Sequence, residues 1–288
     1  MSSKGALVAI PVVVLIALAF AVAGSQGGAT VQGIPVFGLA VAVIFAVQWL
    51  AFAAAYALRT ESFFDLTGAA TYIGVTIMAV LLSPAADART VLLAVLVVVW
   101  AARLGTFLVR RIRRAGRDAR FDELKNSFAR FLAVWTIQGL WITLTAGAAL
   151  AAIAGARKEL DACAFIGLAI WVAGFAIEVT ADLQKSRFRS NPANKGRFIS
   201  SGLWSWSRHP NYFGEIVLWL GVALVAEKAL QGWQLVTLVS PVFVALLLVR
   251  VSGIPILERR ADEKWGGQPD YEAHKRRTSL LIPLPPRS

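Results

Sequence analysis

The stretch from Val36 to Leu58, VFGLAVAVIFAVQWLAFAAAYAL, contains no charged side chain. About 20 consecutive apolar residues are enough for a helix to cross the hydrocarbon core of a bilayer. Comparable apolar blocks run from Leu7 to Ala23, Val91 to Val99 and Val242 to Val249. The sequence therefore predicts an all-α fold, a polytopic bundle of transmembrane helices.

The overall composition supports this class. Of the 288 residues, 57% are hydrophobic and 16% are charged, and the mean hydropathy is +0.64. Soluble domains are about 45–50% apolar and about 25% charged, so the composition excludes a disordered chain, a fibrous repeat and an ordinary cytosolic enzyme. Cys163 is the single cysteine, which rules out a disulfide framework, and the two histidines lack a metal-binding spacing. We expect no metal site.

The apolar blocks predict eight spans, at 6–24, 34–58, 66–82, 90–109, 128–154, 161–181, 209–226 and 233–252. A signal peptide is the alternative for the first span. Its cleavage site would be weak and Lys4 would be its one basic residue, so we expect a retained helix. The expected domains are an extra N-terminal transmembrane helix at 1–30 and one membrane domain at 31–288.

The basic residues predict the orientation. With the 110–130 loop placed in the cytoplasm, 24 of the 29 Lys and Arg residues fall on the cytoplasmic side. This bias follows the positive-inside rule and places both termini in the cytoplasm. The net charge of +12 is then explained by the anionic membrane face or a phosphate-bearing ligand, without nucleic acid. The loops on the opposite side are short, so we expect function on the cytoplasmic side.

The stretch from Glu178 to Glu215 combines carboxylates at expected membrane depth with a series of basic residues. Glu178 and Asp182 are one helical turn apart on one face, and carboxylates at membrane depth are costly unless they are paired or functional. Arg and Lys residues, turn glycines and Trp204 follow, and together they predict a phosphate cradle with a stacking wall. The alternative is anchoring of basic and Trp side chains at the membrane surface.

The run SRHPNYFGE, residues 207–215, predicts the start of a helix with Pro210 in its first turn. Asn211 and Glu215 then lie one turn apart. Arg208 and His209 stand beside the helix N-terminus, a combination that attracts an anion. The alternative is a well-capped helix with a buried hydrogen bond between Asn211 and Glu215.

Several motifs together resemble one family. They are PANKGRF (192–198), GLW (202–204), SRHPNYFGE (207–215), RVSGIPILE (250–258) and the closing Tyr271, RRTS (276–279) and Ile282-Pro283. They resemble the bacterial DUF1295 family, which is similar to the steroid 5α-reductase and sterol C14-reductase group, over roughly residues 60–285. Isoprenylcysteine and phospholipid methyltransferases carry a similar Arg-His-Pro block.

This resemblance implies a seven-helix core that binds NADPH from the cytoplasm. Glu178 and Asp182 would meet the adenosine or ribose, Arg189 and Arg197 the phosphates, and Asn211 and Tyr212 the nicotinamide. The other residues that we assign to the cofactor site are Arg103, Arg111, Arg187, Asn194, Trp204, Arg208, His209, Glu215, Arg250 and Glu258. No GxGxxG follows a strand, so any nucleotide must bind the helical bundle itself.

Reduction of a double bond conjugated to a carbonyl requires a proton donor and stabilisation of the oxygen. Asp65 opens the third predicted span, and Tyr72 is two turns deeper on the same face. These two residues are the predicted catalytic pair. A helix N-cap is the alternative for Asp65, and interfacial packing is the alternative for Tyr72. In the resembling reductases the carbonyl-polarising Tyr matches Trp100 here, so Tyr72 would have to replace it.

The sequence thus predicts an NADPH-dependent membrane reductase that acts on an apolar enone-like lipid, such as a steroid or isoprenoid, entering from the bilayer. Its expected partners are this lipid and membrane lipids, with no nucleic acid and no metal. One alternative is a methyltransferase that uses S-adenosylmethionine and needs few phosphate-binding arginines. The other is a non-catalytic lipid-binding or transport protein, which needs neither the nucleotide nor Asp65.

Overall fold

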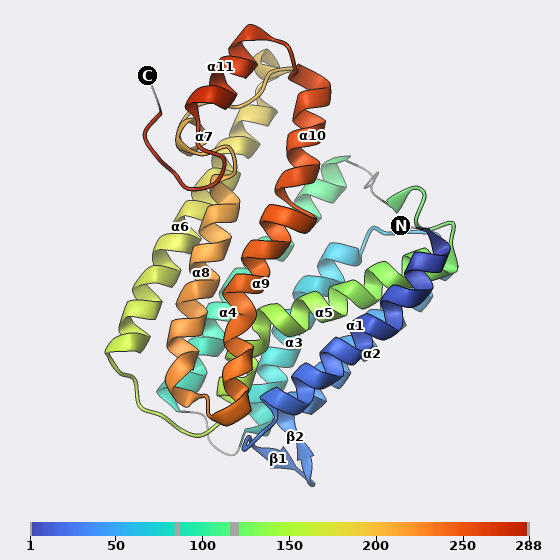
Figure 1. The fold of residues 1–288 in the computed structure, drawn as a ribbon, viewed down its shortest axis with the longest axis vertical. Helices are drawn as coiled ribbons and strands as arrows, with labels where there is room; N and C mark the ends of the chain where they lie inside the picture. Colours follow the sequence, from blue (N-terminus) through green and yellow to red (C-terminus); the bar gives the residue numbers. More distant parts are fainter. Residues whose placement is uncertain (1, 84–86, 116–120, 287–288) are drawn as a thin grey trace. The chain divides into compact units, whose positions relative to one another are not determined.

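Helices dominate the structure, a computed structural model that describes residues 2–83, 87–115 and 121–286, except for the side chains of 111–115 (Figure 1). The one sheet in the described residues is a hairpin of β1 (Thr30–Val31) and β2 (Ile34–Pro35). The predicted all-α class is confirmed. The longer helices are α1 (Ser3–Gly24), α2 (Val36–Ala57), α3 (Phe64–Leu82), α4 (Ala88–Ala115), α5 (Phe128–Ile153), α6 (Ala162–Ser190), α8 (Pro210–Ala226), α10 (Ile254–Trp265) and α11 (Pro269–Arg277).

Seven helical segments in the described residues are long and apolar enough to cross a membrane. They are α1 to α6 and the run Gly232–Trp265. The chain is an integral membrane protein. The predicted span at 209–226 corresponds to α8, whose 17 residues are at the lower limit for crossing a bilayer. The count of eight spans therefore stays a prediction.

The last of these segments is longer than predicted and changes its character along its length. It contains η4 (Gly232–Val239), α9 (Ser240–Leu246), the π-helical turn η5 (Leu247–Val251) and α10. The predicted span ends at residue 252, where Ser252 and Gly253 interrupt the helix. Pro255 in the first turn of α10 then restarts it. The polar helix α10 is an extension that apolar patterning did not predict.

The chain forms two compact units. The first comprises Met1–Phe165 and Val222–Ser240, and the second comprises Ile166–Gly221 and Pro241–Ser288. The predicted division at residue 30 remains a prediction.

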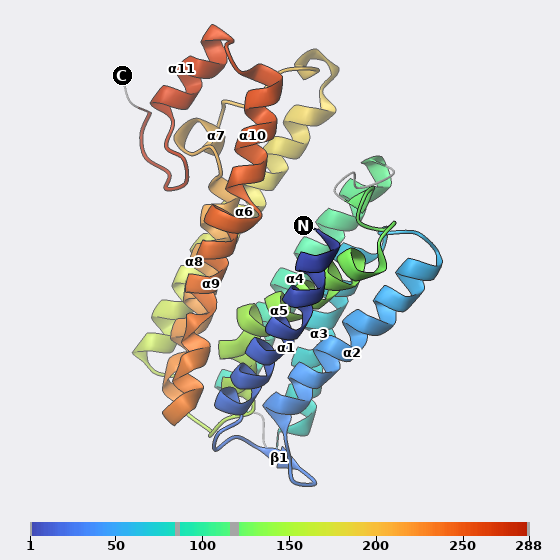
Figure 2. The ribbon, with the colours of Figure 1, turned by 45° about the vertical axis from the view of Figure 1, so that its right-hand side comes forward.

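In the first unit, α5 packs against α1 and α2, and α3 packs against α2 and α4 (Figure 2). Side-chain hydrogen bonds connect these helices. Gln48 Nε2 donates to Thr71 Oγ1 at 3.0 Å, Trp49 Nε1 donates to Thr136 Oγ1 at 3.2 Å, and Gln138 donates to the carbonyl of residue 64 at 3.3 Å. Such bonds contribute to helix association in a membrane, where lipid tails are as apolar as leucine.

In the second unit, α6 and α8 lie side by side (Figures 1 and 2). A Cβ added to Gly174 would approach the Leu218 nitrogen to 2.5 Å, and one added to Gly214 would approach the Glu178 nitrogen to 2.6 Å. Any larger residue at either position would separate the two helices. Backbone-to-backbone packing at these glycines therefore fixes α8 against α6. The residues that precede α8 are positioned with it.

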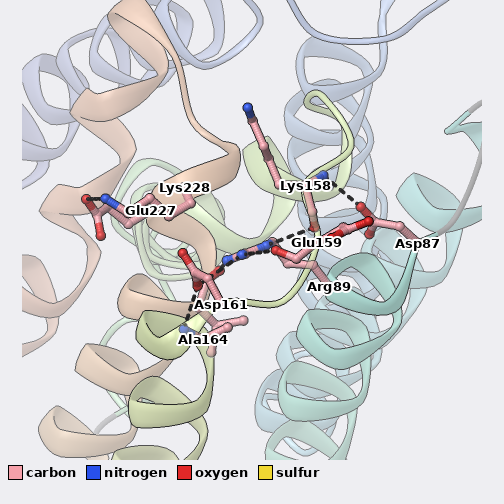
Figure 3. A network of polar contacts seen from close by, with 9 residues as sticks. Asp87, Arg89, Lys158, Glu159, Asp161, Ala164, Glu227 and Lys228 are labelled. Atoms are coloured by element: carbon pink, nitrogen blue, oxygen red, sulfur yellow. Dashed lines mark hydrogen bonds and ion pairs between the residues drawn. The ribbon is translucent and has the colours of Figure 1, made fainter.

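A buried arginine connects three segments of the first unit (Figure 3). The side chain of Arg89, at the start of α4, is 2% exposed. Its guanidinium donates to the carbonyls of Val225 at 2.6 Å, Glu159 at 2.5 Å and Lys158 at 3.2 Å, and it pairs with Asp161 at 3.2 Å. These bonds join α4 to the loop before α6 and to the end of α8.

We expect Arg89→Met to destabilise the protein. Removing one partner of a buried, hydrogen-bonded ion pair costs about 3–5 kcal/mol, and here backbone carbonyls also lose their donor. Thermal unfolding in detergent should show a melting temperature lower by roughly 6–20 °C, at about 2–4 °C per kcal/mol. Arg157→Met is the matched control, because Arg157 is in the same loop region and is exposed. Equal melting temperatures of the two variants would contradict this role.

Candidate functional site

A cavity of about 340 Å³ lies within the second unit. Figure 1 shows that the C-terminal end of α6, the short helix α7 (Leu203–Trp206), α10 and α11 lie together at one end of the unit. The cavity is at this end. All of the lining residues belong to the second unit: Lys185, Phe188, Arg189, Arg197, Phe198, Ile199, Trp204, Arg208, His209, Leu257, Glu258, Arg260, Ala261, Lys264, Trp265, Tyr271 and His274.

The lining is strongly cationic. It includes six Lys and Arg side chains, and Glu258 is the one carboxylate among the described lining residues. Arg189, Arg197, Arg260 and Lys264 are exposed. A cleft lined by charges of one sign focuses the field and concentrates ligands of the opposite sign. Arginine also presents a planar fork of donors that matches phosphate oxygens. The cavity can therefore bind a phosphate-bearing ligand.

Aromatic side chains form part of the wall. Trp204 is buried, and its Nε1 donates to the carbonyl of Ala181 at 3.0 Å. Lys185 Nζ lies 4.2 Å from the centroid of the Trp204 ring. Trp265 Nε1 donates to the carbonyl of Gly196 at 2.6 Å, which ties α10 to the turn that follows α6. Large rigid rings in a cationic cavity provide stacking surfaces for a heteroaromatic base.

Glu258 connects α10 to the residues before α8. Its Oε2 lies 2.7 Å from Arg208 Nη1, and its Oε1 lies 2.8 Å from His209 Nε2. His209 is 4% exposed, and its ring stacks on Tyr212 with centroids 5.7 Å apart. An ion pair to Arg208 and a hydrogen bond to His209 thus join three residues of the predicted cofactor site, Glu258 included, on the cavity wall.

Helix α11 contributes Tyr271 and His274. The Tyr271 hydroxyl donates to Asp262 Oδ1 at 2.9 Å, and burial together with this bond raises the pKa of Tyr271, so the phenol stays protonated. Burial, and then the charges of Arg208 and Arg277, lower the pKa of His274. His274 is therefore neutral at pH 7, and its Nδ1 lies 3.1 Å from the Thr278 hydroxyl.

The C-terminal segment is fixed alongside the residues that precede α8. The backbone N–H of Arg208 donates to the carbonyl of Ser279 at 2.9 Å, and the Ser207 hydroxyl donates to the carbonyl of Leu281 at 2.7 Å. The Ser207 hydroxyl also accepts from the His209 N–H at 3.1 Å. These bonds fix the backbone of Arg208 and His209.

Six residues of the predicted cofactor site line this cavity: Arg189, Arg197, Trp204, Arg208, His209 and Glu258. The glycines that the sequence predicts in turns of the stretch 178–215 are Gly196 and Gly202, and both have a positive φ, +84° and +62°. Lys185 is one of the basic residues of the predicted phosphate cradle. The sequence did not predict a site role for Arg260, Lys264, Trp265, Tyr271 and His274. A signal existed on α10, where Leu257, Arg260 and Lys264 recur at the helical period.

The other predicted residues of the second unit are not among the residues that line this cavity. Glu178 and Asp182 are buried in α6, and Asn211, Tyr212 and Glu215 are half-buried in the first two turns of α8. The remaining three lie at the rim of the unit or in turns: Arg187 is exposed at the end of α6, Asn194 donates to the carbonyl of Phe188 at 3.0 Å, and Arg250 is exposed in η5.

The predicted catalytic pair belongs to the first unit. Asp65 is half-buried in the first turn of α3, and Phe63 occupies the N-cap position. The capping alternative for Asp65 is therefore wrong, because the helix begins one residue before it. Tyr72 is 6% exposed, and its ring packs edge-on against Trp100 with centroids 5.1 Å apart. This is the packing alternative for the ring, and it places Tyr72 beside the position where the resembling reductases have their Tyr.

Two predicted arginines also belong to the first unit. Arg103 is half-buried in α4, with its guanidinium 5.4 Å from the centroid of the Phe107 ring. The side chain of Arg111 lies outside the described residues.

Comparison with known proteins identifies the family. The profile of the "Protein of unknown function (DUF1295)" matches residues 51–278, which is most of the chain. The chain belongs to the DUF1295 family. No solved structure matches it significantly.

Three relatives show where this DUF1295 protein is similar to curated proteins. An uncharacterized protein of Schizosaccharomyces pombe is 23% identical over 230 residues, 69% of this chain and 64% of that protein. The probable O-methyltransferase ustE of Ustilaginoidea virens is 28% identical over 100 residues, 35% of each chain. The 3-oxo-5-alpha-steroid 4-dehydrogenase 1 of Bos taurus is 34% identical over 67 residues, 23% of this chain and 26% of that enzyme. Each match spans less than two thirds of the relative, and these relatives are fungal and mammalian.

Proposed function

We propose that this DUF1295 protein is a membrane enzyme that uses NADPH to reduce a carbon–carbon double bond in an apolar enone-like lipid, such as a steroid or isoprenoid. The cavity of the second unit carries the proposal, because six cations and an aromatic wall line it. NADPH has phosphates for such cations, and it has a heteroaromatic adenine and a flat dihydronicotinamide ring that can stack. The short match to a steroid dehydrogenase supports the same class of reaction.

The residues present fit this cofactor. Arg189, Arg197 and Arg260 offer forked donors for phosphate oxygens, and Trp204 and Trp265 offer faces for a base. A volume of about 340 Å³ is at the lower end of the range for small-molecule sites, so the cavity would take one part of a dinucleotide. When bound, NADPH would supply the hydride.

A methyltransferase is the second candidate, because the match to the probable O-methyltransferase covers 100 residues. S-adenosylmethionine carries a sulfonium and an ammonium against one carboxylate, so it is a net cation. The cavity has one carboxylate among its described lining residues and six cations. Like charges repel strongly where solvent is partly excluded, so the charge of this cavity favours the dinucleotide.

The phosphate role predicts the effect of Arg197→Ala on cofactor affinity. Loss of a hydrogen bond to a charged group costs about 1.5–3 kcal/mol, so the Kd for NADPH should rise about 10- to 150-fold. Lys195→Ala is the control, since Lys195 is exposed in the same turn and removes an equal charge. Calorimetric titration in detergent measures both. Equal Kd values for the two variants would show that Arg197 contributes only general positive charge.

We propose Asp65 as the proton donor, with the buried Tyr72 hydroxyl polarising the substrate carbonyl. Because Asp65 does not cap α3, Asp65→Asn removes the acid without removing a cap. Turnover should fall about 10²- to 10⁴-fold, the usual contribution of a positioned acid, while NADPH affinity and melting temperature stay within error. NADPH oxidation with a panel of enone lipids measures this. Wild-type turnover in Asp65→Asn would exclude the acid role.

We also propose that both termini and the cofactor cavity face the cytoplasm and that the lipid enters from the bilayer. In a Cys163→Ser background, an impermeant maleimide should label Arg157→Cys in intact cells. It should label Ser200→Cys only after permeabilisation. Both positions are exposed, so accessibility of the side chain does not bias the comparison. The reverse labelling pattern would invert the orientation.

A further inference from the structure

Three buried side-chain nitrogens on the cavity wall have no hydrogen bond within the part of the chain that the structure describes: Nδ1 of His209, and Nε and Nη1 of Arg208. Arg208 Nη1 lies 2.7 Å from Glu258 Oε2 in an ion pair, which leaves His209 Nδ1 and Arg208 Nε. The side chains of His209 and Arg208 are 6% and 16% exposed, and both residues line the cavity. A buried polar atom without a hydrogen bond is destabilising, so a ligand group that satisfied both remaining atoms would bind favourably.

Glu258 determines whether Nδ1 of His209 is a hydrogen-bond donor or an acceptor. A carboxylate only accepts hydrogen bonds, so the contact of 2.8 Å between Oε1 and His209 Nε2 places the ring proton on Nε2. Burial of the ring disfavours a second proton, and so do the neighbouring cations Lys185 and Arg208; together they outweigh the opposing attraction of Glu258. Nδ1 of His209 is then a hydrogen-bond acceptor, while Nε of Arg208 is always a donor.

We infer that Arg208 and His209 form a recognition site for an amide-like edge of the nucleotide. Such an edge accepts from Arg208 Nε and donates to His209 Nδ1. Phosphate oxygens cannot do this, because they only accept and would face the Nδ1 lone pair. NADPH has two suitable edges, the nicotinamide carboxamide and the amino edge of adenine. This inference rests on the proposed cofactor and adds which group of the cofactor the Arg208–His209 pair recognises.

The tautomer is testable without any ligand. The chain has two histidines, so protein labelled with ¹⁵N-histidine gives two imidazole spectra, and His274→Gln assigns them. His209 should show a protonated Nε2 and an unprotonated Nδ1 at pH 7. A spectrum with both nitrogens protonated would overturn the inference, because His209 would then be a donor that suits an anion.

Cofactor analogues test the recognition itself. The hypoxanthine analogue of NADPH lacks the adenine amino donor, and the reduced 3-acetylpyridine analogue lacks the carboxamide N–H₂. Wild-type protein should bind one of them about tenfold more weakly than NADPH, because a tenfold change in Kd corresponds to about 1.4 kcal/mol, which is within the range for one net hydrogen bond. The analogue that loses affinity identifies which edge is read. Equal affinity for NADPH and both analogues would overturn the inference.

His209→Gln is the matched variant, because a glutamine amide can still donate to Glu258 but offers no acceptor at the Nδ1 position. Its affinity for NADPH should fall about tenfold, and it should no longer distinguish NADPH from the discriminated analogue. Retained discrimination would overturn the inference even if affinity fell. Absence of NADPH binding to the wild-type protein would instead overturn the proposed cofactor, and the ligand-free tautomer would still report on His209.

Discussion

The paired contacts of Glu258 hold the candidate site together. Its two carboxylate oxygens lie 2.7 Å from Arg208 and 2.8 Å from His209, so one side chain on α10 fixes both residues before α8. Without it, the largely buried Arg208 guanidinium would have no counter-charge among the described residues that line the cavity, and the His209 imidazole would lose its hydrogen bond. The tautomer that we infer for His209 follows from this carboxylate, which also positions α10 together with the hydrogen bond from Trp265 to Gly196.

The membrane imposes the second constraint, because the helices that pack in it are apolar and most charged side chains must lie elsewhere. Apolar helices carry the packing, through close contacts at Gly174 and Gly214 in the second unit and through side-chain hydrogen bonds in the first. Charged side chains gather instead on polar helical extensions and turns, where α10 and α11 provide the cavity wall. Arg89 is an exception with a structural explanation, because its guanidinium is satisfied by backbone carbonyls and Asp161.

Apolar length predicted α1 to α6 because a helix in lipid must satisfy its own backbone. Motif content predicted the part of the cavity wall that is local in sequence, from Arg189 to His209. It did not predict Arg260, Lys264 or His274. These residues reach the cavity through the packing of the polar helices α10 and α11, and an apolar pattern does not predict where polar helices pack. Capping chemistry misplaced the start of α3, where Phe63 rather than Asp65 is the N-cap.

We propose that the cavity of the second unit holds a phosphate-bearing dinucleotide. The most direct measurement is the melting temperature of the detergent-solubilised protein with NADPH or with S-adenosylmethionine. A ligand at 100 times its Kd stabilises the native state by about 2.7 kcal/mol. NADPH should raise the melting temperature, and S-adenosylmethionine should leave it unchanged. Stabilisation by S-adenosylmethionine alone would identify a methyltransferase, and stabilisation by neither would contradict a nucleotide site.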